Sequence, residues 1–203
     1  MVRSGGGLQL LVAFVALTVG TAEAPATVAE QRARLPPAAE CESPIAGRWK
    51  ALVYSYPTES WYEHNLEIHQ DPKDPTILTG SHRVDAWIGT ADDAEPKHCI
   101  QRQKGKMVSS GTFSNGEVSF RSQDYETVAV VCGFEVGYNP DHFTGRLEPE
   151  RQEFQAVNND GGAAVNEPAV FRRIGCLDDA GPKAHDSKVA PPAFFPKRRT
   201  GGC

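Results

Sequence analysis

The sequence feature that most constrains the fold is the Asn115-Gly116 pair, which lies between two β-like runs at residues 108–113 and 117–121. A two-residue hairpin turn needs positive φ at both central positions, and Asn and Gly adopt that conformation at the lowest cost. The runs at 142–147 and 152–157 flank a short polar turn in the same manner. Recurring hairpins of this kind predict an all-β fold, and no segment shows the periodicity of an amphipathic helix.

Eight to ten short strands follow one another between residues 41 and 176, with the even spacing typical of a β-barrel or a β-sandwich. Several of these strands carry an internal glycine, which indicates the bending that a barrel requires. In a closed barrel the first strand, 45–54, and the last, 169–174, are antiparallel neighbours. We therefore predict a single antiparallel up-and-down β-barrel of eight to ten strands over residues 41–176.

Four of the five cysteines lie inside the predicted barrel, and four cysteines allow three pairings. Closure places the start of the first strand beside the end of the last, which brings Cys41 close to Cys176. Cys99 and Cys132 are then left to form a second disulfide across the middle strands. Cys203 is expected to be free or to link two chains, so the protein is expected to be a monomer or a dimer through Cys203.

Residues 1–24 have the form of a signal peptide, with Arg3 ahead of a short apolar run and small residues at the cleavage position. The run is too short to cross a bilayer, so no membrane span is expected in the mature protein. A secreted or periplasmic location follows, where disulfides persist. Residues 25–40 are interpreted as a linker and residues 177–203 as a disordered tail. The net charge of −5 gives no electrostatic reason to expect nucleic acid or an anionic membrane as a partner.

Gly47 and Trp49 open the first strand as Gly-x-Trp, which resembles the signature of the calycin barrels: lipocalins, fatty-acid-binding proteins and avidins. In lipocalins this tryptophan closes one end of the barrel, and an arginine of the last strand lies across it. The resemblance implies these roles for Trp49 and for Arg172 or Arg173, through cation–π contact and hydrogen bonds to backbone carbonyls. It implies a lipocalin- or avidin-type architecture and carries over no biotin site.

Aromatic residues gather around the loop at 57–60, where the mouth of a barrel would lie. Rings with polar tips at such a mouth suit recognition of a small molecule or a glycan, although core packing would use each of them as well. His64 shares a strand face with Leu66 and Ile68, which predicts that it points into the barrel. The candidate ligand-binding residues are Tyr54, Tyr56, Trp61, Tyr62, His64 and Trp87.

Motifs for metal binding or catalysis are missing from the sequence. The histidines show no His-x-His or His-x₃-His spacing and are interpreted as structural or surface residues. Residues 158–162 are rich in oxygen ligands but lack the order of a calcium loop, and their Asn and Gly residues also suit a tight turn. No nucleophile elbow, zinc-protease motif or phosphate loop is present. We expect no metal, no cofactor and no catalytic residue.

These features predict an exported barrel that binds a small apolar or amphipathic ligand, and two alternatives remain open. One is a non-enzymatic module with a solid core, whose loops at 89–97 and 158–168 bind another protein or the cell envelope. The other is a hydrolase, which requires a histidine within hydrogen-bond reach of a carboxylate and an exposed nucleophile. Cavity volume separates the first two readings, because a ligand pocket needs roughly 300 Å³.

Overall fold

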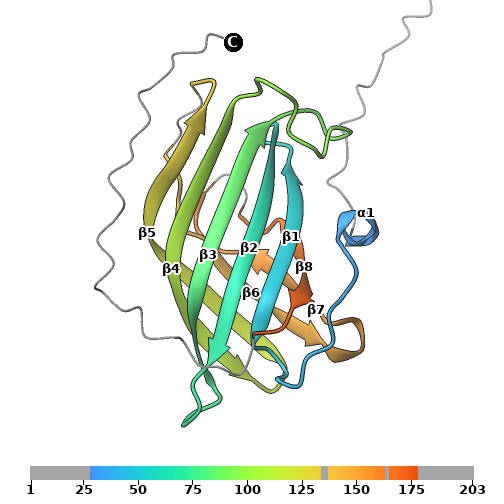
Figure 1. Ribbon diagram of the computed structural model, residues 1–203, viewed down its shortest axis with the longest axis vertical. Helices are drawn as coiled ribbons and strands as arrows, with labels where there is room; N and C mark the ends of the chain where they lie inside the picture. The colour runs from blue at the N-terminus through green and yellow to red at the C-terminus, as the bar shows by residue number, and fades with distance from the viewer. Residues whose placement is uncertain (1–27, 134–136, 163–164, 178–203) are drawn as a thin grey trace, which may run out of the picture.

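The computed structural model describes residues 28–133, 137–162 and 165–177, and these residues form a closed antiparallel β-barrel of eight strands (Figure 1). The strands pair in sequence order, and β8 returns to pair with β1. The prediction of a single all-β, antiparallel up-and-down barrel is therefore confirmed. The predicted signal peptide and all but the first residue of the predicted tail lie outside the described residues. The strands are β1 (Gly47–Ser55), β2 (Ser60–Gln70), β3 (Ile77–Ile88), β4 (Arg102–Ser114), β5 (Glu117–Val131), β6 (His142–Glu148), β7 (Glu153–Asn158) and β8 (Pro168–Gly175).

Alternation along the strands fixes which side chains fill the barrel. In β1, Trp49, Ala51 and Val53 point inward, because they belong to the buried cluster that fills the interior. The remainder of that cluster combines aliphatic residues with four Phe residues, of which Phe171 packs against Phe154 with ring centroids 4.7 Å apart. This apolar filling surrounds Trp49 near the start of β1 and extends to Val53, Phe143 and Ala169.

The segment before β1 closes that end of the barrel. The Trp49 indole Nε1 donates to the Ile45 carbonyl at 2.9 Å, and both residues are fully buried. Gly47, with a φ of 153°, lies so close to β8 that a Cβ would come within 3.0 Å of the Gly175 carbonyl oxygen. The glycine of the Gly-x-Trp motif is therefore required by the approach of the first and last strands.

Two of the four barrel cysteines form the predicted disulfide across this closure. Cys41 and Cys176 are bonded, with their Cα atoms 5.5 Å apart, and this prediction is confirmed. The Sγ atoms of Cys99 and Cys132 lie 3.0 Å apart, and Cys132 is free, so the predicted disulfide between these two residues is not formed. Barrel pairing thus brings both predicted pairs together, since Cys99 precedes β4 and Cys132 follows β5. Cys203 lies outside the described residues.

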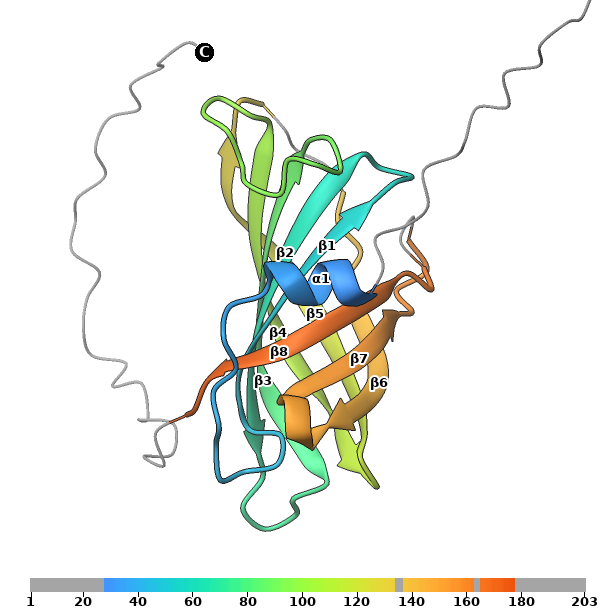
Figure 2. The same cartoon turned by 90° about the vertical axis from the view of Figure 1, so that its right-hand side faces the viewer.

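A short helix, α1 (Val28–Arg34), lies within the segment interpreted as a linker, where the sequence shows no helical periodicity. In Figure 2 the helix lies across β8 on the outside of the barrel. Gln31 is buried there, donating to the Pro168 carbonyl at 2.8 Å and accepting from the Val170 amide at 2.9 Å. A helix of seven residues is held by such tertiary contacts and gives no clear periodicity in the sequence.

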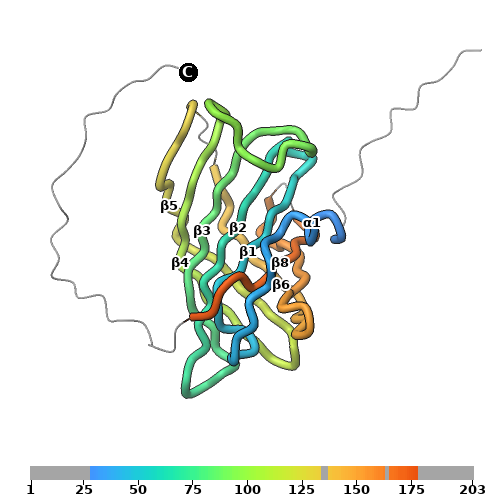
Figure 3. Tube along the Cα trace, turned by 45° about the vertical axis from the view of Figure 1, so that its right-hand side comes forward, coloured from blue at the N-terminus to red at the C-terminus, as the bar shows by residue number. Residues whose placement is uncertain are grey.

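From α1 the chain runs alongside the barrel to the end where β1 begins (Figure 3). On the way, the Ala39 amide donates to the Arg173 carbonyl at 2.9 Å. A second apolar cluster, which we call the outer cluster, lies between the outer face of β1–β3, the helix segment and the loop after β3. Its buried members are Leu35, Leu52, Tyr54, Trp61, Trp87 and Val170, and Val28, Tyr56, Ala91, Ala94 and Ile100 pack against them.

Within the part of the chain that the structure describes, no helix has both the length and the apolar character needed to cross a membrane.

Candidate ligand-binding cavity

A cavity of about 390 Å³ lies inside the barrel, towards the β1–β2 turn and away from Trp49. Val53, Phe143 and Ala169 supply an apolar wall, and residues of the β1–β2 turn, β2, the loop before β6, the end of β7 and the loop before β8 supply the rest. The complete lining is Val53, Thr58, Ser60, Tyr62, His64, Gly137, Tyr138, Asn139, Asp141, Phe143, Asn158, Asp160, Gly162, Glu167 and Ala169.

Two of the six predicted ligand-binding residues, Tyr62 and His64, line this cavity. The structure places the other four in or against the outer cluster: Tyr54, Tyr56, Trp61 and Trp87. The register explains the separation, because Trp61 pairs with Tyr54 and with Trp87 on the outer face, whereas the next residue, Tyr62, pairs with the inward Val53. Grouping these aromatic residues by their distance from the loop at 57–60 therefore combines side chains that point into the barrel with side chains that point outward.

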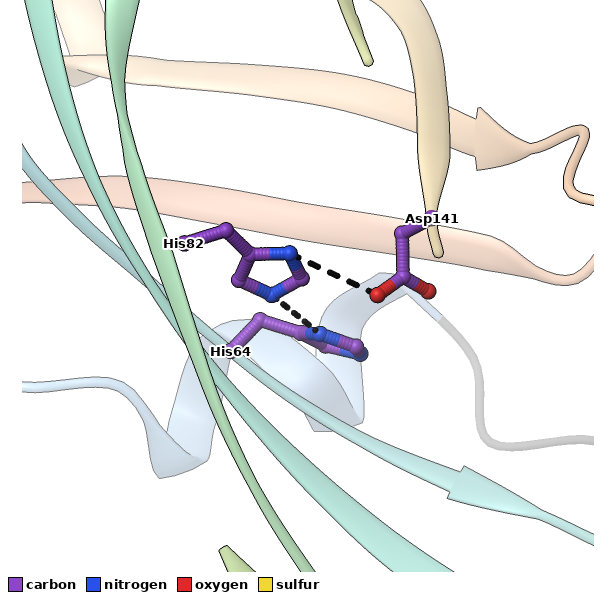
Figure 4. A group of neighbouring side chains, drawn as sticks. All are labelled: His64, His82 and Asp141. Atoms are coloured by element: carbon purple, nitrogen blue, oxygen red, sulfur yellow. Dashed lines mark hydrogen bonds and ion pairs between the residues drawn. The ribbon is translucent and has the colours of Figure 1, made fainter. Parts of the chain in front are cut away.

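His64 and His82 form a buried pair on neighbouring strands (Figure 4). His64 Nδ1 lies 3.0 Å from His82 Nε2, and the two side chains are 5% and 0% exposed. On its other side, His82 Nδ1 lies 3.0 Å from the Ser122 hydroxyl and 3.4 Å from Asp141 Oδ2. Ser122 also fixes the loop before β6, because its amide donates to the Asp141 carbonyl at 2.8 Å.

Asp141 is buried and accepts hydrogen bonds on both carboxyl oxygens. Tyr138 donates its hydroxyl to Oδ2 at 2.7 Å, and Asn158 donates its amide to Oδ1 at 2.7 Å. Burial raises the pKa of Asp141 to about 7, even though these hydrogen bonds act in the opposite direction. Burial, followed by the proximity of Asp141, also raises the pKa of Tyr138 well above its usual value.

Burial keeps both histidines neutral at physiological pH. It lowers the pKa of His64 to about 3, and burial together with the neighbouring His64 lowers the pKa of His82 well below its usual value. When Asp141 is ionised, above its pKa of about 7, it can only accept a hydrogen bond, and the network then assigns the tautomers of both histidines. His82 Nδ1 carries the proton that faces Asp141, His82 Nε2 accepts from His64 Nδ1, and His64 Nε2 is left as an acceptor at the cavity.

One nitrogen of each histidine and one Asp141 oxygen lie within 4.8 Å of one another, close enough for three ligands of one metal ion. These atoms are already engaged, however: the two rings hydrogen-bond to each other and Asp141 binds Tyr138 and Asn158. A metal ion would have to replace those bonds. The three side chains instead form a chain of hydrogen bonds from Asp141 through His82 to His64, and this chain determines which His64 nitrogen accepts a hydrogen bond at the cavity.

The same atoms do not form a Ser–His–Asp catalytic triad. Such a triad places the serine and the carboxylate on opposite nitrogens of the ring. Here both the Ser122 hydroxyl and Asp141 Oδ2 face His82 Nδ1, and Ser122 is 3% exposed. Ser122 is therefore a buried structural partner of His82.

The sequence interpretation missed five residues of this site: Tyr138, Asp141, Asn158, Glu167 and His82 as a partner of His64. His82 shares its strand face with the buried Leu78 and Val84, so alternation along β3 could have identified it as inward-facing. The remaining four lie in or beside loops whose Pro, Asn and Gly residues indicate only turns.

No family model, curated protein or solved structure matches this chain.

Proposed function

We propose that this protein is an exported, non-enzymatic binding protein of calycin type that holds one small amphipathic molecule inside its barrel. The observation that carries the proposal is the internal cavity of about 390 Å³ with His64 at its wall. Pockets for small molecules usually measure roughly 300–1,000 Å³, so the volume favours a ligand over a solid core.

The lining residues indicate the general chemistry of the ligand. Val53, Phe143 and Ala169 favour an apolar body, since burial of apolar surface contributes roughly 25 cal/mol per Å². Tyr62 and the acceptor nitrogen of His64 favour a single polar group on that body. A few polar groups in a mostly apolar pocket are what orients a small molecule.

Export is supported by the Cys41–Cys176 disulfide and by the signal-like character of residues 1–24. Structural disulfides persist in oxidising compartments and are rare in the cytosol. The Gly-x-Trp strand and the arginine over its tryptophan support the calycin type.

The test uses naphthylmethanol, a neutral aromatic alcohol small enough for the cavity, with binding followed by calorimetry. Replacing Ala169 with Phe fills the cavity, and we expect roughly tenfold weaker binding or none. Val157→Phe is the matched control, because Val157 is an exposed residue of the neighbouring strand β7 and should bind as the wild type does.

Circular dichroism checks that Ala169→Phe is folded, and Val53→Phe fills the cavity from the neighbouring strand β1 if it is not. Equal affinity in a folded cavity-filled variant and the control would place the alcohol outside the barrel. That result would refute the proposed function.

A further inference from the structure

The ionisable side chains that line the cavity include acidic groups but no basic ones with a permanent positive charge among the described residues. Asp141, Asp160 and Glu167 each bring a carboxyl group, whereas no lysine or arginine is among the lining residues in the described part of the chain. Transfer of an anionic ligand into such a pocket would add like-charge repulsion to the cost of its desolvation. The lining therefore disfavours carboxylates, phosphates and sulfates.

Hydrogen-bond donors at the cavity are largely used by the protein itself. Tyr138 donates to Asp141, and Asn158 donates to the same carboxylate. The Tyr62 hydroxyl lies 3.2 Å from the Thr58 hydroxyl, and Ser60 donates to the Thr58 carbonyl at 2.8 Å. A ligand that only accepts hydrogen bonds would thus find few free partners.

Acceptors, by contrast, remain available. Glu167 Oε2 is buried and has no hydrogen-bond partner in the described structure, while its Oε1 lies 3.3 Å from the Ser55 hydroxyl. His64 Nε2 is a second acceptor when Asp141 is ionised, because the hydrogen bonds through His82 then place the His64 proton on Nδ1. A buried acceptor without a donor costs free energy, which a donor on the ligand would recover.

Aromatic rings also line the cavity. The Tyr62 and Tyr138 rings both line the cavity, with centroids 6.4 Å apart, and Phe143 lies in the same wall. Cations bind favourably over aromatic faces, and ammonium groups are commonly recognised by such rings together with carboxylates.

We propose that the ligand of this cavity is a small organic cation: an amine that carries an ammonium group on an apolar or aromatic body. The ammonium group lies beside Glu167, where it donates to the unpaired oxygen, and the apolar body packs against Val53, Phe143 and Ala169. The inference rests on the proposed function, because it names the chemical class of the ligand in the same cavity.

The experiment compares three probes that share one naphthyl body and differ only in the polar group: naphthylmethylammonium, naphthylmethanol and naphthoate. Calorimetry at neutral pH gives each affinity for the full-length protein. We expect the ammonium to bind roughly tenfold or more tightly than the alcohol, as a charge-assisted hydrogen bond requires, and the carboxylate to bind most weakly.

Glu167→Gln tests the assignment to one side chain, since it keeps the shape and removes the charge. The ratio of ammonium to alcohol affinity should fall by roughly tenfold in this variant. Glu117→Gln is the matched control, because Glu117 is an exposed carboxylate at the β4–β5 hairpin and should leave the ratio unchanged.

The outcomes separate the two proposals. If the alcohol binds but the ammonium shows no preference, or if Glu167→Gln leaves the preference intact, the amine inference is wrong and the proposed function stands. If Zn²⁺ binds in the cavity and displaces the alcohol while the ammonium shows no preference, the site takes an inorganic cation instead. If none of the three probes binds, both proposals fail.

Discussion

The guanidinium group of Arg173 lies over the indole ring of Trp49, with Cζ 4.7 Å from the ring centroid. The same group donates to the Ser43 carbonyl at 2.6 Å and to the Pro44 carbonyl. Arg172, the other candidate, points outward and binds Glu153. The residue of β8 with the inward position therefore holds both the tryptophan and the segment that closes this end of the barrel.

Replacing Trp49 with Ala should lower the free energy of unfolding by about 3–5 kcal/mol, as expected for a fully buried large aromatic residue. Arg173→Met keeps the stem and removes the cation–π contact and the carbonyl hydrogen bonds. The two changes should couple by about 0.5–2 kcal/mol in a double-mutant cycle measured by urea denaturation. Arg172→Met serves as the control pair with Trp49→Ala, and equal coupling in both cycles would refute the role of the stacked arginine.

The closure of the barrel could be predicted because its signals are local or follow from chain order. The Asn115-Gly116 turn is found as the β4–β5 turn, with positive φ at both residues. Cys41 and Cys176 flank the strands that must meet if the sheet closes, and the disulfide joins them. Each of these inferences needs only strand order and the antiparallel rule.

The cavity could be predicted only in part, because β1 is buried on both faces from Ala51 to Ser55. The inner face packs in the barrel and the outer face packs in the outer cluster, so apolar character does not show which side is inside. Only the register separates the inward Tyr62 from the outward Trp61. The His82–Asp141 contact joins β3 to a distant loop, and no local pattern encodes it.

Gln31 completes the hydrogen bonding of β8 where β1 no longer reaches it. The β1–β8 register covers Arg48 to Lys50 of β1, and Gln31 instead binds the Val170 amide and the Pro168 carbonyl. Gln31→Ala should lower the free energy of unfolding by about 1–3 kcal/mol, because it leaves buried backbone groups without partners. It should also speed hydrogen exchange at the Val170 amide.

Ala29→Ser is the control for this prediction, since Ala29 is an exposed residue of the same helix. If Gln31→Ala and Ala29→Ser gave equal stability and equal protection of the Val170 amide, α1 would contribute nothing to the closure of the barrel.

The buried titratable groups predict that stability falls in mild acid. Below pH 6.5 the unfolded chain protonates His64 and His82, whereas burial keeps both neutral in the folded protein, so folding loses stability as pH falls. Asp141 acts in the opposite sense. Its pKa of about 7 in the folded protein means that it holds a proton that the unfolded chain has released above pH 3.8.

The two histidines outweigh the single carboxyl group, so the free energy of unfolding falls by about 1.4 kcal/mol for each pH unit of acidification near pH 5. Asp141→Asn removes the opposing contribution and should roughly double this slope, and His64→Gln should reduce it towards zero. Urea denaturation between pH 4.5 and 6.5 measures the three slopes. Equal slopes in the wild type and in both variants would show that these groups titrate in the folded protein as they do in the unfolded chain.

The Sγ atoms of Cys99 and Cys132 lie 3.0 Å apart, next to the Arg102–Val131 pair of β4 and β5. Their proximity favours a disulfide between them under oxidising conditions, to which Cys132 brings a free thiol, and this bond would stabilise the fold by about 3–4 kcal/mol in the chain-entropy model. Peptide mapping without reduction should give Cys41–Cys176 and Cys99–Cys132, with Cys203 alkylated or linked to a second chain.

Stability measurements test the same pairing independently of the mapping. Cys99→Ser and Cys132→Ser should each lower the free energy of unfolding by a similar amount in the oxidised protein, and the double variant should cost no more than either single variant. Cys203→Ser, the control, should leave stability unchanged. A peptide that joins Cys41 to Cys99, or additive losses in the double variant, would contradict the pairing.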